Sequence, residues 1–186
     1  MSFTLDLWLF HHLFQWLHQP FLVPVFSRLT HLGDPGSILF VGVVGVIEAI
    51  AAGRRMARLN PGAERPSLLP WLGILLAALA TGWLKEMVGR PRPAEIFGIP
   101  GLDPREMGRS FPSGHAVGIF ALARILDLRW PKGRAVWWSI AVLVALSRVA
   151  LGLHWPSDVA AGALIGLGSV EFFIWLEQRK TVDQRR

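Results

Sequence analysis

Five strongly apolar runs, separated by short charged segments, constrain the fold of this chain more than any other feature of its sequence. They lie near residues 37–53, 68–88, 114–130, 135–152 and 157–177, and several are only about 17 or 18 residues long. That length is close to the shortest α-helix able to cross the roughly 30 Å hydrocarbon core of a bilayer. Because 52% of the 186 residues are hydrophobic and only 17% are charged, the chain has more apolar material than a soluble core of this size buries. The sequence predicts an all-α, polytopic membrane helix bundle with about five transmembrane helices.

The first 34 residues have a different pattern, in which apolar residues recur at helical spacing beside a polar face. The apolar positions are Leu5, Trp8, Leu9, Leu13, Trp16 and Leu17, and the polar positions are Asp6, His11, His12, Gln15 and His18. This pattern is typical of an amphipathic helix lying in the membrane interface, and Pro20 and Pro24 divide the segment into two pieces. A sixth crossing through about residues 7–26 is the competing interpretation. Residues 33–36, Gly-Asp-Pro-Gly, predict a plain turn before the first crossing.

The positions of the basic residues predict the orientation in the membrane. Three clusters follow the first, third and fifth runs: Arg54, Arg55, Arg58 and Arg65; Arg129, Lys132 and Arg134; and Arg179, Lys180, Arg185 and Arg186. With five crossings the three clusters fall on one side, which the positive-inside rule makes cytoplasmic. We therefore expect an inner-membrane protein with a cytoplasmic C-terminus and outward-facing connections at residues 89–113 and 153–156.

Composition also limits the class of function. The formal net charge of +6 could indicate nucleic-acid binding, but that needs a basic face on a soluble domain rather than short clusters between apolar runs. The chain has no cysteine, which excludes disulfides and cysteine metal sites. The first basic residue is Arg28, so a cleaved secretory signal is not expected. Without a linker, we expect one domain over residues 1–186, with an amphipathic region at 1–34, a transmembrane catalytic bundle at 35–180 and a cytoplasmic tail at 181–186.

Three segments in the two outward connections hold most of the residues capable of chemistry. Residues 85–93, Lys-Glu-Met-Val-Gly-Arg-Pro-Arg-Pro, place three cations at one helix end. Residues 111–115, Phe-Pro-Ser-Gly-His, precede an apolar run and leave first-turn N–H groups open to an anion. In residues 147–158, Gly152 suits a helix end and Pro156 a helix start, which predicts a tight turn holding His154 and places Asp158 in the first turn of the next helix. This Asp can bind one imidazole nitrogen and leave the lone pair of the other free for attack.

Each of the three segments taken alone also has a purely structural explanation. Snorkelling cations, a Ser N-cap with an incidental His, and a capping Asp beside an interfacial His would give the same patterns. Together they resemble the three-part signature of the type-2 phosphatidic acid phosphatase superfamily. The parts are Lys, six residues and Arg-Pro; then Pro-Ser-Gly-His; then Ser-Arg, five residues, His, three residues and Asp. Order and spacing agree without a gap from Lys85 to Asp158, and only the N-terminal third has no matching motif.

The resemblance implies a role for each motif residue. His154 would attack phosphorus and form a phosphohistidine, Asp158 would orient His154, and His115 would protonate the leaving group and then activate water. The phosphoryl oxygens would be bound by Lys85, Arg92, Ser113, Gly114 and Arg148. Pro112 and Ser147 would support the site, Ser147 by hydrogen bonding to Arg148 or His154. Arg90 has no role in the resemblance, and would be an accessory contact or a snorkelling side chain.

We expect no metal and no cofactor. Two histidines and an aspartate could form a facial metal triad, but the cations gathered in the same pocket would repel a divalent ion. A site beside the bilayer predicts a membrane lipid phosphate as substrate: undecaprenyl pyrophosphate, phosphatidic acid, phosphatidylglycerol phosphate or a lipid A phosphate. Analogy with small envelope proteins of this layout favours the first, and the loop at 94–110 could contribute to the selection.

Three other functions compete with this interpretation. An anion transporter or channel would need polar residues along its helices at mid-membrane, where Glu48 and Glu171 are the nearest exceptions to an apolar pattern. A second competitor is an enzyme of the same fold acting on a soluble phosphate ester, or as a haloperoxidase. A catalytically silent lipid-binding relative is the third, and the unbroken motif set disfavours it.

Overall fold

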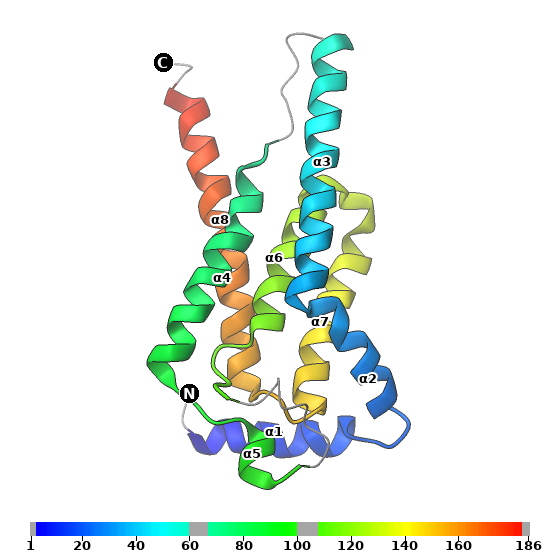
Figure 1. Ribbon diagram of the computed structural model, residues 1–186, viewed down its shortest axis with the longest axis vertical. Helices are drawn as coiled ribbons and strands as arrows, with labels where there is room; N and C mark the ends of the chain where they lie inside the picture. The colour runs from blue at the N-terminus through cyan, green and yellow to red at the C-terminus, as the bar shows by residue number, and fades with distance from the viewer. Residues whose placement is uncertain (1–2, 60–66, 100–107, 184–186) are drawn as a thin grey trace.

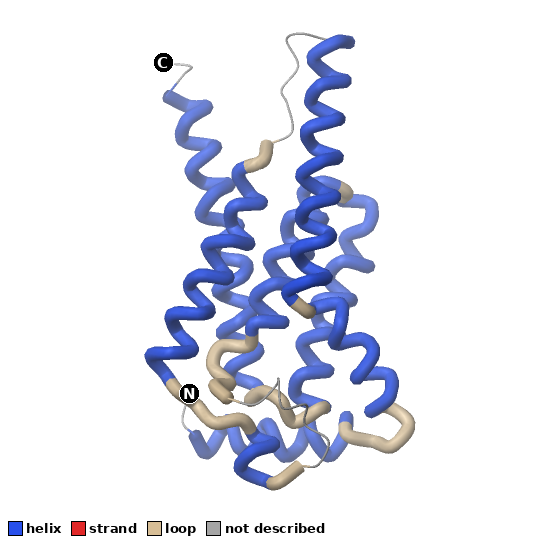
Figure 2. Tube along the Cα trace, in the orientation of Figure 1, coloured by secondary structure: helices blue, strands red, loops and turns tan. Residues whose placement is uncertain are grey.

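The computed structural model describes residues 3–59, 67–99 and 108–183, which contain helices and no strand (Figure 2). This confirms the predicted all-α class. The elements in chain order are α1 (Phe3–Leu17), α2 (Val23–Leu29), η1 (Thr30–Gly33), α3 (Pro35–Leu59), α4 (Leu69–Val88), α5 (Pro93–Phe97), α6 (Gly114–Arg129), η3 (Pro131–Gly133), α7 (Arg134–Ala150) and α8 (Pro156–Asp183).

Each of the five predicted apolar runs is a helix, and α3, α4, α7 and α8 are long and apolar enough to cross a membrane. The helix α6 has 16 residues, so at 1.5 Å per residue it is only about 24 Å long. The described residues thus contain four helices that meet the length of a crossing, and the fifth predicted crossing is not established. The chain is nonetheless a multi-pass membrane protein, and large apolar side chains such as Phe40, Leu79 and Leu164 are exposed on its helices.

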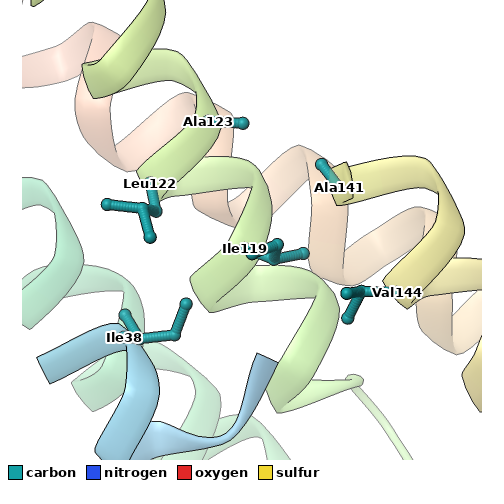
Figure 3. Close-up of a cluster of buried hydrophobic side chains, with 6 residues drawn as sticks. All are labelled: Ile38, Ile119, Leu122, Ala123, Ala141 and Val144. Atoms are coloured by element: carbon teal, nitrogen blue, oxygen red, sulfur yellow. The ribbon is translucent and has the colours of Figure 1, made fainter. Parts of the chain in front are cut away.

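The short helix α6 lies at the centre of the bundle and packs against α3, α4, α7 and α8 (Figure 1). Its residues Ile119, Leu122 and Ala123 form a buried cluster with Ile38 of α3 and with Ala141 and Val144 of α7 (Figure 3). Because neighbours surround it, α6 buries eight of its 16 residues, Asp127 among them. This explains why a helix that carries Arg124, Asp127 and Arg129 can sit inside an apolar bundle.

The contact between α6 and α8 depends on two glycines four residues apart. A Cβ atom added to Gly162 would lie 2.6 Å from the Ser113 carbonyl oxygen, and one added to Gly166 would lie 2.2 Å from that of Val117. Small residues at this spacing let two helix backbones approach closely inside a membrane. The approach brings the start of α8 beside the start of α6, and the Ser113 N–H donates to the Asp158 carbonyl at 3.1 Å.

The N-terminal helix α1 lies across one end of the bundle, roughly perpendicular to the long helices (Figure 1). Phe10 of α1 packs in a buried cluster with Val149 and Trp155. Residues 7–26 therefore do not form a sixth crossing alongside the others. The amphipathic prediction was wrong for Asp6, which was assigned to the polar face but is only 2% exposed, because it binds polar groups of the site described below.

The opposite end of the bundle carries most of the basic clusters and several ion pairs between helices. Arg129 binds both carboxylate oxygens of Glu48, at 2.9 and 2.8 Å, and so joins α6 to α3. Arg124 binds Glu171 at 2.5 Å and joins α6 to α8. Residues 184–186 of the predicted tail, and Arg65 of the first cluster, lie outside the described residues.

Candidate active site

Backbone hydrogen bonds join the three motif segments directly at the end of the bundle where α1 and α5 lie. The Ala94 N–H donates to the Gly152 carbonyl at 2.9 Å, which ties the first segment to the third. The Ser110 N–H donates to the Arg90 carbonyl at 2.7 Å. This bond joins the residue just before the second segment to the first segment. Together with the bond between Ser113 and Asp158, these contacts fix segments that are far apart in sequence as one unit.

A cavity of about 890 Å³ opens between α3, α4 and α6 next to these segments. Six of the predicted site residues line it: Lys85, Arg92, Gly114, His115, Arg148 and His154. The rest of the lining is mostly apolar, with Leu39, Val43 and Ile47 from α3 facing Ile74 and Leu75 from α4. The cavity is therefore polar and basic at one end and apolar along the rest of its length.

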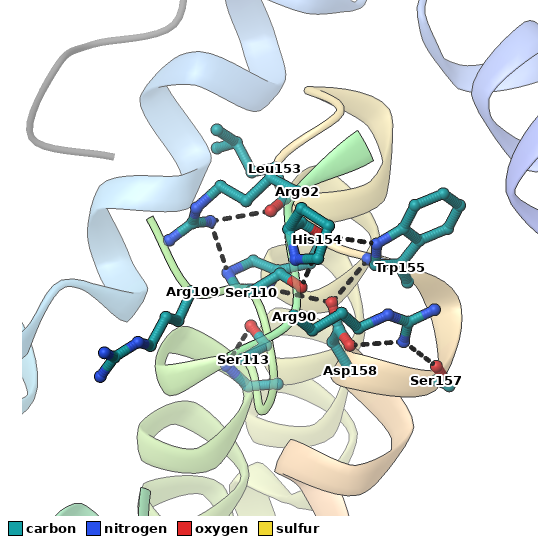
Figure 4. Close-up of polar contacts among 12 residues, drawn as sticks. Arg90, Arg92, Arg109, Ser110, Ser113, Leu153, His154, Trp155, Ser157 and Asp158 are labelled. Carbon is teal, nitrogen blue, oxygen red and sulfur yellow. Dashed lines mark hydrogen bonds and ion pairs between the residues drawn. The ribbon is translucent and has the colours of Figure 1, made fainter. Parts of the chain in front are cut away.

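His154 is held by the turn between α7 and α8 that the sequence predicts. Gly152 has a φ of 71°, a left-handed conformation that glycine adopts at little cost. The backbone N–H groups of Leu153 and His154 both donate to the Arg148 carbonyl, at 3.0 and 3.1 Å. The imidazole is 1% exposed, so the turn presents a buried ring in a fixed orientation (Figure 4).

The two ring nitrogens of His154 have different surroundings. Nε2 lies 3.1 Å from Nη1 of Arg92, at the cavity. Nδ1 lies 3.6 Å from Oδ2 of Asp158, on the opposite side of the ring. Burial, and then the positive charges of Arg148, Arg92 and Lys85, hold the pKa of His154 well below its ordinary value of 6.5. The ring is therefore neutral at physiological pH, as attack by a nitrogen lone pair requires.

Asp158 is fixed by contacts to both of its carboxylate oxygens. Oδ2 accepts a hydrogen bond from the backbone N–H of Trp155 at 2.9 Å, and Oδ1 accepts one from Nη1 of Arg90 at 2.8 Å. Asp158 is completely buried, so the arginine supplies the counter-charge that a buried carboxylate needs. Of the two roles that the sequence left open for Arg90, the structure shows the accessory contact and not the snorkelling side chain.

Asp6 completes this network from the N-terminal helix. Its carboxylate accepts from Nη2 of Arg90 at 2.5 Å, and from the backbone N–H and hydroxyl of Ser157 at 3.0 and 2.5 Å. Arg90 also lies over the ring of Trp155, 4.9 Å from its centroid. Sequence reasoning missed Asp6, because a partner 84 residues away leaves no periodic signal.

His115 is the second residue of α6 and is bound by the turn that was predicted to be a plain breaker. Its Nε2 lies 2.8 Å from Oδ1 of Asp34, whose Oδ2 lies 2.9 Å from Nδ1 of His31. A Cβ atom added to Gly33 would lie 3.0 Å from Cδ2 of His115, so the glycine lets the turn pack closely on the ring. Sequence reasoning missed this role of residues 31–34.

The cations at the polar end of the cavity are positioned by neutral oxygens. Arg92 donates to the Leu153 carbonyl at 2.7 Å, Arg148 to the Thr30 hydroxyl at 2.8 Å, and Lys85 to the Arg109 carbonyl at 2.8 Å. Arg92 and Arg148 are buried. Thr30, like Asp34, comes from the segment before α3 that contains no motif residue.

The remaining predicted residues frame the start of α6. Ser113 is its N-cap, with a side chain that accepts from the Ala116 N–H at 3.5 Å, and Gly114 is its first residue. Pro112 is fully buried beside them. The expected support from Ser147 was wrong, because its hydroxyl donates to the Val144 carbonyl at 2.6 Å instead of reaching Arg148 or His154. A serine within a helix often returns its proton to the preceding turn in this way.

The described residues contain no group of three His, Asp or Glu side chains arranged to hold a metal ion. Metal independence itself stays a prediction. In the loop at 94–110, residues 100–107 lie outside the described part. Of the remainder, Glu95 accepts from the Gly108 N–H at 2.8 Å, and Arg109 pairs with Glu86. The proposed contribution of this loop to substrate selection stays untested.

Comparison with known proteins agrees with the motif resemblance. The family model for the PAP2 superfamily matches residues 67–181, well over half of the 186-residue chain. The chain belongs to the PAP2 superfamily. The match begins before α4 and includes every predicted site residue, whereas α1, α2, η1 and α3 precede it.

Individual PAP2 relatives include proteins from several bacteria. The chain is 33% identical to a decaprenylphosphoryl-5-phosphoribose phosphatase of Mycobacterium tuberculosis, over 80% of this chain and 76% of that protein. It is 26% identical to a lipid A 1-phosphatase of Rhizobium johnstonii over 74% of this chain, and the alignment spans only 61% of that relative. The crystal structure of Aquifex aeolicus LpxE superposes with a TM-score of 0.73 and 26% identity, covering 93% of this chain and 96% of that one.

Proposed function

We propose that the protein is an integral-membrane lipid phosphatase that works through a phosphohistidine on Nε2 of His154. The observation that carries the proposal is the cavity, whose basic end holds both motif histidines while the rest is apolar and lies between α3 and α4. A lipid phosphate has the same division, with an anionic head and an apolar tail. The family and the names of its relatives support the same class of activity.

In the first step, Nε2 of His154 forms a bond to phosphorus and the bond from phosphorus to the lipid oxygen breaks. The imidazolium of His115 gives its proton to that oxygen, and the lipid alcohol or phosphate leaves. In the second step neutral His115 takes a proton from water, the water oxygen attacks phosphorus, and the bond to His154 breaks. Inorganic phosphate and the original enzyme result, so the protons balance over the cycle.

The other residues act on charge and orientation. Arg92, Arg148 and Lys85 line the basic end and would neutralise the phosphoryl oxygens as charge develops. At the start of α6, the hydroxyl of Ser113 and the backbone N–H of Gly114 would add hydrogen bonds to the same oxygens. Asp158 would hold His154 in the attacking orientation and stabilise its positive charge after attack.

The proposal extends to the placement of the protein. The site end faces outward, because the basic clusters gather at the opposite end and the positive-inside rule places them in the cytoplasm. We take the chain as one phosphatase domain in the inner membrane, with a cytoplasmic C-terminus. The transporter alternative is disfavoured because Glu48 and Glu171 pair with Arg129 and Arg124 at the far end. Among the described residues, the cavity lining away from its basic end is mostly apolar.

Phosphate release from four lipids tests this proposal. The purified protein, with excess EDTA, is incubated with undecaprenyl pyrophosphate, phosphatidic acid, phosphatidylglycerol phosphate and lipid A, and with glucose 6-phosphate as a soluble ester. We expect turnover of at least one lipid in chelator, little turnover of the soluble ester, none in His154→Ala and slowed turnover in His115→Ala. His12→Ala is the matched control, because His12 is an exposed histidine of α1 whose Nδ1 bonds to the Trp8 carbonyl of the same helix. Turnover that requires added metal, or that persists in His154→Ala, would overturn the mechanism.

A further inference from the structure

The turn before α3 presents an acidic group to a cavity whose other charged residues are basic. Among the described residues that line the cavity, Asp34 is the one carboxylate. Lys85 of α4, Arg92 of the connection before α5, Arg148 of α7 and His154 of the turn before α8 line the same cavity as His115. Asp34 is bound to His115, with 2.8 Å between its Oδ1 and Nε2 of the ring.

Proton transfer to the leaving group requires His115 to be protonated when the substrate is bound. Three neighbouring cations disfavour a further positive charge on the ring, and an adjacent carboxylate favours it. Through its contact with Asp34, His115 has this compensation. An imidazolium has two N–H groups, so one can remain on Asp34 while the other serves the leaving oxygen.

The geometry shows that the pair is built into the fold. The side chains of His115 and Asp34 are 12% and 39% exposed, and Gly33 lets the turn approach the ring. Asp34 is also held by His31 from the same turn. Burial alone would raise the pKa of Asp34, but its hydrogen bonds to His31 and His115 outweigh burial and keep the pKa below its ordinary value. The carboxylate is therefore charged over the neutral pH range.

We propose that Asp34 is a positioning residue that keeps His115 oriented and protonated for proton transfer to the leaving group, with His31 holding the carboxylate in place. The inference rests on the proposed phosphatase function. It assigns a role to a residue outside the part of the chain that matches the family model, residues 67–181. The N-terminal third would thus supply part of the acid–base machinery as well as covering the bundle.

Two substrates with different leaving groups separate this role from a structural one. An alkyl lipid phosphate needs a proton on its leaving oxygen, whereas p-nitrophenyl phosphate releases a stable phenolate that does not. We expect Asp34→Asn to lower kcat on the lipid by about 10- to 100-fold, a part of the usual contribution of a general acid. Turnover of p-nitrophenyl phosphate should fall much less. The alkaline limb of the lipid pH profile should also move to lower pH, because His115 loses its proton more easily without the neighbouring negative charge.

Two further variants complete the test. Asp34→Glu keeps the charge and should restore a large part of the lipid activity and of the pH profile. Glu48→Gln is the matched control, because like Asp34→Asn it removes a carboxylate that pairs with α6, but from within α3 and at the opposite end of the bundle. It should change neither the leaving-group dependence nor the pH profile.

The results separate failure of this inference from failure of the proposed function. If Asp34→Asn lowers kcat equally on both substrates and leaves the alkaline limb of the pH profile in place, Asp34 is only structural and the inference is wrong. An unchanged Asp34→Asn enzyme would overturn it as well. If instead the wild-type protein hydrolyses neither substrate, the proposed phosphatase function itself has failed.

Discussion

The two ends of this bundle use the same residue type for different purposes. At the end away from α1, Arg129 and Arg124 pair with Glu48 and Glu171 and join α6 to its neighbours. At the site end, Arg92 and Arg148 donate to a carbonyl and a hydroxyl and line a cavity with two histidines. An arginine inside an apolar bundle is therefore a candidate for function when it lines a cavity beside reactive groups. Burial or charge alone does not make it one.

Removing one arginine from each end should give the largest contrast. We expect Arg148→Gln to lower kcat/KM by about 10²- to 10³-fold, the usual loss when one donor to a developing oxyanion is removed. Arg129→Gln should leave kcat/KM within about twofold and lower stability by about 1 kcal/mol or less, because both partners of this pair are partly exposed. Phosphate release and thermal unfolding in detergent measure the two effects. Equal losses of activity in both variants would remove the distinction between the ends.

A smaller effect is expected from Asp6, which binds Arg90 and Ser157 and acts on Asp158 through Arg90. Asp6→Asn keeps the size of the side chain but removes the charge that binds Arg90 and Ser157. With a looser Asp158, His154 would spend less time in the attacking orientation, so kcat should fall by about tenfold while KM stays nearly constant. Steady-state kinetics test this. A rise in KM at constant kcat would show instead that Asp6 shapes substrate binding.

The smallest expected effect is on the pH dependence of the reaction rate, which depends on the cations at the site end of the bundle. Burial, and then the cations of the site, hold the pKa of His154 well below 6.5, so the ring stays neutral as the pH falls from neutrality through that value. A lower pH also favours the protonated form of His115 that the first step needs. The rate of phosphoenzyme formation should therefore remain flat through this range. A fall in rate centred on 6.5 would show that burial and the cations do not lower the pKa of His154 in this way.

Most of the fold and the centre of the site could be predicted from the sequence, because both depend on local patterns. Apolar runs mark α3, α4, α6, α7 and α8, and motif spacing identifies His154, His115 and the phosphate-binding cations. The length of α6 was harder to predict, since a helix shielded by its neighbours need not span the hydrocarbon core by itself.

What the sequence could not show were contacts between distant segments. Thr30 binds Arg148 across 118 residues, and Asp34 binds His115 across 81. Neither residue belongs to a periodic pattern or a motif, and Asp6 was placed on the wrong face for the same reason. A carboxylate beside two glycines and a histidine, as in residues 31–36, is a weak signal until the structure shows what packs against it.

The account depends most directly on a covalent bond between phosphorus and His154. The His115→Ala variant, given p-nitrophenyl phosphate labelled with ³²P, should accumulate this intermediate, because only its second step still needs the missing base. Quenching in alkali preserves a phosphorus–nitrogen bond, and peptide mapping then locates the label. We expect label on His154, and none in the double variant that also carries His154→Ala. Label on another residue, or turnover by His154→Ala, would contradict the account.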